Sequence, residues 1–251
     1  MKKNDQIAAV VLAAGRGVRM NSKTINKVML PLCGRPMIGY TLATLKKLEI
    51  EKVIIVVGFA RGSVKRFAGP GYFYVEQKKR MGTGHAVKCA LEEIPPIFKE
   101  ILVLNGDDSA FYASHVIKDL IKKHQVNHAV FTLLTIETKN PNGLGRILRD
   151  SKDDISAIIE EKDATSTQRK IKEINPACYV FRRSFLAKYL SKVRKSPVTG
   201  EYYLTDLVRL GVKSQERISS FKAKDIIWQG INTWEELQTA EKLMRRFKNG
   251  S

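Results

Sequence analysis

The segment that organises the chain is a short apolar run followed by a glycine-rich turn, Ile7-Ala8-Ala9-Val10-Val11 and then Leu12-Ala13-Ala14-Gly15-Arg16-Gly17-Val18-Arg19-Met20. The β-branched run is typical of a buried parallel strand. Small residues in the turn allow a ligand to approach the backbone, whose successive N–H groups can bind phosphate. Arg19 and the following Lys27 add positive charge. We expect this loop to hold a nucleoside triphosphate, although the turn alone is equally typical of an ordinary surface loop.

The composition indicates a globular protein of one large domain or two small ones, because the chain has 251 residues, of which 43% are hydrophobic. No run of 18 apolar residues occurs, so we expect no membrane span. The three cysteines, Cys33, Cys89 and Cys178, are far apart and form neither a disulfide framework nor a metal-binding motif. This pattern, with no signal peptide at the N-terminus, favours a cytoplasmic protein. We expect it to be a monomer or a small homo-oligomer.

The charge of the chain is strongly positive, with a formal net value of +19. Such a value raises nucleic acid as a partner. The basic residues are nevertheless spread over the whole sequence, and no long basic tail or aromatic-basic repeat occurs. We therefore interpret the charge as a general surface property that attracts anionic substrates, and we do not expect nucleic-acid binding.

The first 125 residues alternate between apolar runs and amphipathic segments, which is the pattern of a parallel α/β sheet. Ser114 is the expected N-cap of the last helix in this half. The pattern predicts strands at 7–11, 53–57, 72–75 and 101–104, and helices at 36–48, 63–67, 84–93 and 114–124.

The alternation of strand and helix patterns changes in the second half of the chain, where the pattern predicts a mixed sheet. Thr233-Trp234-Glu235-Glu236 has the pattern of a capping box at the start of a final amphipathic helix. The expected strands lie at 129–135, 143–148, 155–160, 171–175, 178–181 and 226–232, and shorter helices lie at 185–190 and 204–210. Because no internal repeat or break in composition occurs, we expect one domain, with halves at about 1–125 and 126–251.

Polar residues follow several of the predicted strands, at the sheet edge where α/β proteins bind ligands. Asp107 suits a hard cation such as Mg²⁺, and Asn232 offers a second oxygen ligand. Gln77 carries a donor and an acceptor suited to a pyrimidine edge, and Gly82 offers an unobstructed backbone N–H. Each of these residues taken alone is also typical of a turn, a helix cap or a solvated loop. We expect His85 to pack or bond locally.

No activated Ser, Cys or His nucleophile is evident in the sequence. The candidate residues instead supply phosphate-binding backbone, cations and a metal carboxylate. These groups serve phosphoryl or nucleotidyl transfer, where positioning and charge neutralisation carry most of the catalysis.

The ordered motifs resemble the sugar-phosphate nucleotidylyltransferases, and most closely the uridylyltransferase (pyrophosphorylase) domain of the bifunctional bacterial N-acetylglucosamine-1-phosphate uridylyltransferases. The resemblance runs from about Ile7 to the last helix. After the Leu12–Met20 loop and Lys27-Val28, the matching pieces are Gln77, Gly82-Thr83-Gly84-His85-Ala86, Gly106-Asp107, Gly143-Leu144-Gly145-Arg146, Glu160-Glu161-Lys162-Asp163-Ala164, Glu173-Ile174-Asn175, Gly200-Glu201-Tyr202-Tyr203-Leu204-Thr205-Asp206 and Gly230-Ile231-Asn232.

The resemblance implies a Rossmann-like α/β fold with a nucleotide-binding first half and a sugar-binding second half. It implies transfer of UMP from UTP to N-acetylglucosamine 1-phosphate, with Mg²⁺, to give UDP-N-acetylglucosamine and pyrophosphate. Arg19 and Lys27 would be catalytic, and Asp107 and Asn232 would bind the metal. The remaining implied contacts are Leu12, Ala13, Ala14, Gly15, Gln77, Gly82, Thr83 and Gly106 to the nucleotide, and Asn105, Gly145, Glu160 and Asn175 to the sugar.

Four departures from the family pattern leave the sugar open. They are Asn26 in place of the usual proline before the lysine, Asn105 with the extra acid Asp108 around Gly106-Asp107, Pro176-Ala177 after Asn175, and Trp228-Gln229 before Gly230. Asn26 predicts a less rigid loop. The alternatives are another base or sugar 1-phosphate, such as UTP with glucose or dTTP with glucose, and a non-catalytic nucleotide-sugar-binding module. No hexapeptide repeat follows, so we do not expect acetyltransferase activity of this chain.

Overall fold

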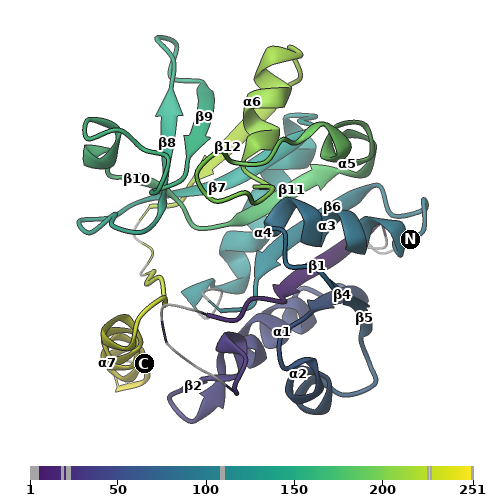
Figure 1. Ribbon diagram of the computed structural model, residues 1–251, viewed down its shortest axis with the longest axis vertical. Coiled ribbons are helices and arrows are strands. Elements are labelled where there is room, and N and C mark those ends of the chain that lie inside the picture. The colour runs from purple at the N-terminus through teal and green to yellow at the C-terminus, as the bar shows by residue number, and fades with distance from the viewer. Residues whose placement is uncertain are drawn as a thin grey trace.

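A mixed β-sheet forms the centre of the computed structural model, which describes residues 6–17, 20, 24–107, 111–224, 226 and 228–249 (Figure 1). The first half contributes four parallel strands in the order β5-β4-β1-β6. Their bounds are β1 (Ile7–Ala13), β4 (Lys52–Val57), β5 (Phe73–Glu76) and β6 (Glu100–Asn105). The expected Rossmann-like arrangement is confirmed.

The second half extends the same sheet rather than building a separate one. β11 pairs antiparallel with β6 and joins the two halves, and β7, β10, β8 and β9 continue the sheet outward, while β12 pairs parallel with β7. The bounds are β7 (Phe131–Glu137), β8 (Gly145–Arg149), β9 (Ile155–Ile159), β10 (Glu173–Asn175), β11 (Cys178–Arg182) and β12 (Ile218–Lys222).

Helices cover both faces of the sheet because successive side chains of a strand point to opposite faces. Ala8 and Val10 of β1 belong to one buried cluster, and Ala9 and Val11 belong to the other. The first cluster includes α3 (Thr83–Glu92), α5 (Arg183–Tyr189) and α6 (Asp206–Lys213), and the second includes α1 (Met37–Lys47), α2 (Arg61–Ala68) and α4 (Ser114–Val126). No helix among the described residues has the length and apolarity to cross a bilayer.

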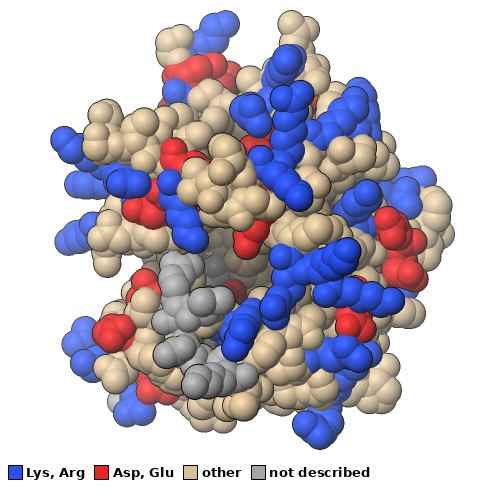
Figure 2. All heavy atoms as spheres, viewed as in Figure 1, with Lys and Arg blue, Asp and Glu red and all other residues tan. Residues whose placement is uncertain are grey.

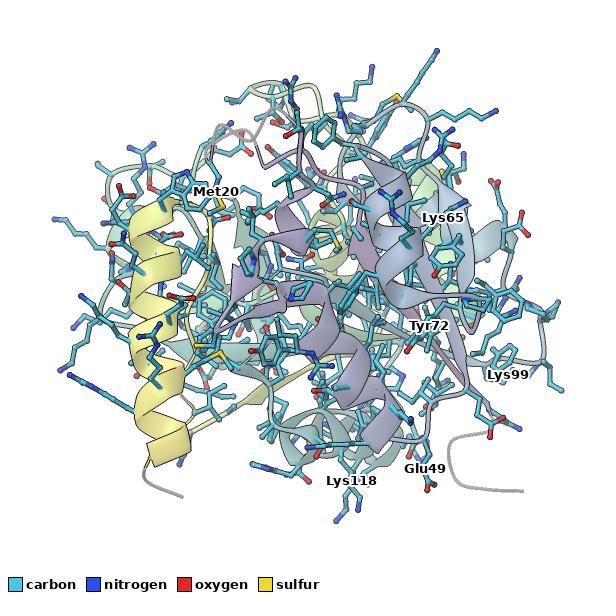
Figure 3. All side chains as sticks on the ribbon, turned by 90° about the horizontal axis from the view of Figure 1, so that it is seen from below. Met20, Glu49, Lys65, Tyr72, Lys99 and Lys118 are labelled. Atoms are coloured by element: carbon cyan, nitrogen blue, oxygen red, sulfur yellow. The ribbon has the colours of Figure 1, made fainter. Side chains whose placement is uncertain are left out.

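The last helix, α7 (Trp234–Asn249), packs outside the sheet against the short hairpin of β2 (Pro31–Leu32) and β3 (Arg35–Pro36) (Figure 1). The predicted capping box is confirmed, since the Glu236 N–H donates to Thr233 Oγ1 and the Thr233 N–H donates to Glu236 Oε2, each at 3.2 Å. Met20 lies near the N-terminal end of α7 (Figure 3), where its carbonyl accepts from the Trp234 indole. This end of the helix is therefore anchored beside the glycine-rich loop.

Two details of the sequence-based expectation are wrong. The described residues between 226 and 232 form no strand: Ile226 and Trp228 pack against the core cluster that holds α1 and α4, and Ile231 packs with α7. The strand in this region is β12, whose half-buried Ser219 and Ser220 hide it from an apolar-run pattern. Ser114 is the first residue of α4, and Ala113 occupies the N-cap without a side-chain hydrogen bond.

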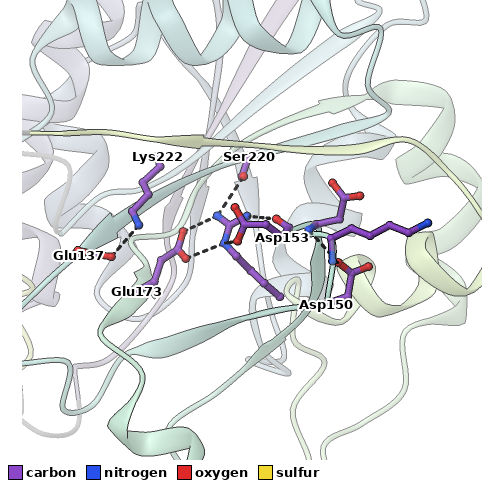
Figure 4. A network of polar contacts seen from close by, with 9 residues as sticks. Glu137, Asp150, Asp153, Glu173, Ser220 and Lys222 are labelled. Carbon is purple, nitrogen blue, oxygen red and sulfur yellow. Dashed lines mark hydrogen bonds and ion pairs between the residues drawn. The ribbon is translucent and has the colours of Figure 1, made fainter.

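A polar network fastens the outer strands on the side where β7, β8, β10 and β12 meet (Figure 4). Arg149 of β8 binds both carboxylate oxygens of Glu173 on β10, at 2.8 and 2.6 Å. Lys222 of β12 donates to Glu137 of β7 at 2.7 Å. Hydrogen bonds from the Arg149 side chain lower the pKa of Glu173 against the opposing effect of burial, which is the largest single influence. These ion pairs stabilise strands that carry some of the candidate site residues.

His124 of α4 is a buried titratable group with an incomplete set of hydrogen bonds. Its Nδ1 contacts Thr132 Oγ1 at 2.9 Å, and within the described part of the chain its Nε2 has no hydrogen-bond partner. Burial, with a smaller effect of Arg182, lowers its pKa to about 4. The folded protein therefore holds the neutral imidazole in conditions where the unfolded chain would already bind a proton.

This shift predicts a loss of stability on acidification. The pKa of His124 is lower in the folded state than its ordinary value, so the unfolded chain binds more protons between about pH 6.5 and pH 4. The free energy of unfolding should fall through this window, by up to about 3 kcal/mol from this residue, and level off below it. Urea unfolding at pH 7 and pH 4.5 should show a smaller acid-induced loss in His124→Gln than in the unchanged protein. Equal losses in both proteins would refute this assignment.

Candidate active site

A cleft of about 680 Å³ opens at the carboxyl ends of the parallel strands, and a smaller hollow of about 140 Å³ adjoins it. Figure 2 looks onto a hollow in the middle of the molecule with Lys and Arg side chains at its margins. The sequence-predicted residues that line the cleft are Leu12, Ala14, Gly15, Lys27, Gln77, Gly82, Thr83, Asn105, Asp107, Glu160 and Asn232, and the adjoining hollow adds Gly145 and Asn175.

Lys27 is the point where three distant parts of the chain meet in the cleft. Its ammonium nitrogen lies 2.5 Å from Asp107 Oδ2, at the end of β6, and donates to Asn232 Oδ1 at 3.0 Å. The side chains of Lys27 and Asp107 are only 12% and 20% exposed, so solvent screens their attraction poorly. Separate residues of the sequence thus form one charged cluster.

Asn232 is held in this cluster by the start of α7. The Glu236 carboxylate, which closes the capping box, also accepts a hydrogen bond from the Asn232 N–H. The negative carboxylate is favourable there because it lies at the positive end of the helix dipole. The cap therefore fixes the backbone from which the Asn232 amide reaches Lys27.

The chemistry of Asp107 and Asn232 fits a small divalent cation. Their two oxygens converge on one positive charge, the Lys27 ammonium group, as two ligands of a cation would. Among the described residues no group of three or more His, Cys, Asp or Glu could hold a metal. A site with one carboxylate and one amide suits Mg²⁺, which takes few protein oxygens and completes its shell with water and phosphate.

The fully buried Asn26 forms hydrogen bonds with the backbone around the glycine-rich loop. Its Nδ2 donates to the carbonyls of Ala13 and Phe59, at 2.8 and 2.7 Å, and its Oδ1 accepts from the Val28 N–H at 3.1 Å. The expectation of a less rigid loop stays a prediction. Asn26 replaces the usual proline by hydrogen bonds that join the ends of β1 and β4 to the short helix containing Lys27.

Two of the predicted nucleotide-binding residues, Ala13 and Gly106, do not line the cleft. Arg19 is outside the described residues. Ala13 points into the core because side chains alternate along β1, and its carbonyl is bound by Asn26. Gly106 is buried between Leu12 and Val28, where a Cβ would meet atoms at 3.1 to 3.2 Å. Gly106 therefore acts by letting Asn105 and Asp107 pass close to β1.

Gln77 is buried at the base of the cleft, and its amide orientation is fixed. Its Nε2 donates to the Gly82 carbonyl at 3.0 Å and lies 2.9 Å from His85 Nδ1. Burial, aided by Lys88, lowers the pKa of His85, which favours the neutral ring as an acceptor. The local bonding expected of His85 is confirmed. The arrangement leaves Gln77 Oε1 as an acceptor for a ligand.

Gly82 has a second reason to be glycine, which the sequence does not reveal. Its φ of 95° lies in the left-handed region, and a Cβ would stand 2.5 Å from the Tyr202 carbonyl oxygen. The two segments also exchange backbone hydrogen bonds, since Gly84 N donates to Tyr202 O and Tyr202 N donates to Met81 O, both at 2.8 Å. The loop before α3 is therefore built against a segment of the second half.

The acidic end of the cleft is centred on Glu160, whose Oε1 accepts from Thr205 Oγ1 at 2.9 Å. Burial is the main cause that raises the pKa of Glu160, and the nearby carboxylates of Asp163, Asp206 and Glu201 raise it further. The Thr205 hydrogen bond opposes these effects. Glu160 is thus a half-buried carboxylate that lines the cleft and can accept hydrogen bonds from hydroxyl groups of a ligand.

Asn175 and its neighbours form the adjoining hollow. Asn175 donates to the Tyr179 hydroxyl at 2.6 Å and accepts from the Ala177 N–H at 3.1 Å. Ala177 is one of the residues that depart from the family pattern. Its φ of 55° lies in the left-handed region that favours glycine. A Cβ at Gly145 would stand 3.2 Å from Ile158 and 3.6 Å from Glu160, so this position also requires close packing.

Several cleft residues were missed by reasoning from the sequence. They lie on segments that carry no strand-end signal, or on motifs whose individual roles were not resolved. The segment 200–206 is one of the matching motifs, and its acidic and hydroxyl side chains are the sequence feature that could have indicated cleft residues there. The additional lining residues are Gly17, Val28, Arg80, Ala86, Gly143, Glu161, Lys162, Tyr179, Glu201, Tyr203, Leu204 and Thr205.

The fold and this cleft define a nucleotidyl transferase. The chain belongs to the nucleotidyl transferase family, whose sequence profile matches residues 8–246.

Individual relatives agree with the family assignment. The chain is 37% identical over 253 residues to the bifunctional protein GlmU of Desulfotalea psychrophila, covering 99% of this chain and 74% of that protein. It is 35% identical to the bifunctional protein GlmU of Oceanobacillus iheyensis and 38% identical to that of a Geobacillus species, covering 95% and 94% of this chain. It spans only about half the length of these two relatives, 52% and 51%.

A solved structure shares the fold. A chain from Bacillus anthracis, assigned as a glucose-1-phosphate thymidylyltransferase and crystallised with sucrose, superposes with a TM-score of 0.80 over 95% of both chains. Its sequence identity is 22%, so this likeness concerns the fold alone.

The Asn26 hydrogen bonds predict that Asn26→Ala is destabilising and weakens nucleotide binding. The variant removes the Asn26 partner from the carbonyls of Ala13 and Phe59 and from the Val28 N–H, so the free energy of unfolding should fall by about 3 kcal/mol. Asn127→Ala, which removes one partly buried side-chain bond to Ser219, is the matched control and should cost about 1 kcal/mol. Urea unfolding measures both. Similar losses in the two variants would show that Asn26 does not fasten the loop.

The raised pKa of Glu160 predicts a pH dependence of sugar-phosphate binding. The ionised carboxylate accepts hydroxyl groups, so the KM for the sugar phosphate should rise on acidification, starting above the pH range of an ordinary glutamate. Thr205→Val removes the hydrogen bond that favours the ionised form and should move this rise to still higher pH. Thr239→Val, exposed on α7, is the control with an unchanged profile. Coincident profiles for all three proteins would contradict the role of Glu160.

Proposed function

We propose that this chain transfers UMP from UTP to N-acetylglucosamine 1-phosphate, giving UDP-N-acetylglucosamine and pyrophosphate. The observation that carries the proposal is the convergence of Lys27, Asp107 and Asn232 at the end of β1 and β6, beside the glycine-rich loop. The family assignment and the ordered motifs from Leu12 to Asn232 support the same reaction class.

The uracil end of the proposed substrate is supported by the fixed orientation of Gln77. Its amide nitrogen is bound to Gly82 O and His85, and Gln77 lines the cleft, so we assign its oxygen as the acceptor offered to a ligand. A uracil or thymine ring carries an imide N–H that can donate to this oxygen. The site therefore suits an imide base, and the choice of UTP over dTTP rests on the resemblance of the motifs.

The sugar end is proposed to be formed by Glu160, Gly145 and Asn175, with Asn105 beside them. The half-buried Glu160 carboxylate is proposed to accept hydrogen bonds from sugar hydroxyl groups, which a carboxylate does better than a neutral group. Close packing around Gly145 limits the space beside the sugar. Pro176 and Ala177 alter the backbone next to Asn175, so the identity of the sugar is the part of the proposal that most needs measurement.

In the proposed reaction, an oxygen of the sugar phosphate attacks the α-phosphorus of UTP. The bond from the α-phosphorus to the bridging oxygen breaks, and pyrophosphate leaves with the electron pair. The attacking phosphate is already ionised at neutral pH, so no base is required. Lys27, held in place by Asp107 and Asn232, supplies positive charge where negative charge gathers, and Arg19 is proposed to act with it.

Asp107 and Asn232 are the proposed ligands of Mg²⁺. The bound ion would offset charge on the phosphate oxygens and help to orient them. The two ligands are held on separate elements, β6 and the cap of α7, so their spacing depends on the packed fold. A cytoplasmic location, the oligomeric state and the single-domain organisation remain predictions from the sequence.

The proposal is tested by a panel of nucleoside triphosphates against sugar 1-phosphates, read by pyrophosphate release. UTP with N-acetylglucosamine 1-phosphate should give the highest kcat/KM, and omission of Mg²⁺ should remove the activity. The panel includes dTTP with glucose 1-phosphate as the second candidate pair. Tight binding of UDP-N-acetylglucosamine without any release of pyrophosphate would favour a binding module and overturn the proposal.

Replacement of Asp107 tests the charged cluster directly. Asp107→Asn keeps the size of the side chain but removes its charge, so kcat should fall about a thousandfold while the protein stays folded. Asp119→Asn, on the exposed face of α4, is the control and should keep normal rates. Normal turnover in Asp107→Asn would exclude the metal assignment.

A further inference from the structure

Two arginines flank one aromatic ring at the mouth of the cleft. The guanidinium carbon of Arg16 lies 5.4 Å from the centre of the Phe59 ring, and that of Arg80 lies 5.9 Å from the same centre. These distances permit cation–π attraction, which restrains long side chains that are otherwise exposed. The ring thus holds two positive charges close together.

The three residues come from neighbouring strand ends. Arg16 follows β1, Phe59 follows β4 and Arg80 follows β5, and these strands are adjacent in the order β5-β4-β1. Phe59 is itself fixed, because its N–H donates to the Ala14 carbonyl at 3.2 Å and its carbonyl accepts from Asn26 at 2.7 Å. The arrangement is therefore a product of the sheet order and of the Asn26 hydrogen bonds.

The charges of this pair are not neutralised by any carboxylate among the described residues. Within the described residues, no carboxylate lies within ion-pair distance of Arg16 or Arg80. The Lys27 charge, in contrast, is matched by Asp107. Arg80 lines the cleft, and Gly15 and Gly17 on either side of Arg16 line it too. Together with Lys162, which also lines the cleft and has no ion pair among the described residues, the pair offers uncompensated positive charge to an anion in the cleft.

We propose that Arg80, together with Arg16, binds the terminal phosphates of the nucleoside triphosphate and the departing pyrophosphate. Arg80 follows β5 and Arg16 lies in the glycine-rich loop after β1, whereas Asp107, which Lys27 contacts, follows β6 on the other side of β1. A triphosphate whose α-phosphorus reacts near Lys27 can extend its other phosphates along the loop toward the arginines. Guanidinium groups suit this role because their planar N–H donors match phosphate oxygens.

This inference rests on the proposed function for the direction of the triphosphate, but its test does not need turnover. Equilibrium binding of pyrophosphate, UTP and UMP is measured by calorimetry, with Mg²⁺ at one fixed concentration. Arg80→Ala should weaken pyrophosphate and UTP binding about tenfold and leave UMP binding unchanged, because UMP lacks the terminal phosphates. Arg80→Lys, which keeps the charge but not the fork of donors, should recover part of the loss.

Two further variants separate a binding site from a general charge effect. Lys78→Ala removes one positive charge from the same loop at an exposed position that does not line the cleft, and it should leave all three affinities unchanged. Phe59→Leu loosens the pair without removing a charge and should weaken pyrophosphate binding about threefold.

The outcomes distinguish this inference from the proposed function. Equal effects of Arg80→Ala and Lys78→Ala, or an equal loss of UMP and UTP affinity in Arg80→Ala, would overturn the phosphate-binding role of Arg80. Failure of the substrate panel with intact, Arg80-dependent pyrophosphate binding would overturn the proposed reaction while leaving the anion site in place.

Discussion

The contact of the Lys27 ammonium group with Asp107 and Asn232 is the interaction on which the site depends. It joins a residue after β1, a residue after β6 and a residue before α7, which are separated by up to 205 positions in the sequence. Each partner is fixed by its own surroundings: Lys27 follows the buried Asn26, Asp107 follows the close-packed Gly106, and Asn232 is held by the α7 cap. The charges are poorly screened because the cluster is partly buried. The cluster therefore requires the complete fold, not a local motif.

The two halves of the chain also depend on each other around Gln77, the residue proposed to bind the nucleobase. Gly82, which precedes α3 in the first half, leaves room only for the backbone of Tyr202 from the second half. The hydrogen bonds between these segments close one wall of the cleft. Gln77 then acquires its orientation from the Gly82 carbonyl and from His85. The orientation of Gln77, which is proposed to serve base recognition, is thus a consequence of packing between distant segments, and the glycine is required by geometry as well as by its backbone angle.

The departures from the family pattern have different physical meanings once the surroundings are known. Asn26 stands in place of a rigid ring and makes three hydrogen bonds to the backbone around the loop. Ala177 adopts a left-handed backbone next to Asn175, which places a conformational constraint at the hollow beside the sugar end. Trp228 packs against the core rather than facing the cleft. Of these, only Ala177 adjoins residues proposed to contact the sugar.

The sequence by itself determined the alternating first half, the strand-end positions of the candidate residues and the capping box of α7, because these features follow from local periodicity and spacing. It also indicated Lys27, Asp107 and Asn232 individually. Only the tertiary structure decided that these three meet, that Ala13 and Gly106 face inward, and that β12 rather than the 226–232 segment pairs with β7. Arg80 and Phe59 became relevant for the same reason. Such facts depend on which strands are neighbours and on what fills the space between them, and a one-dimensional pattern carries neither.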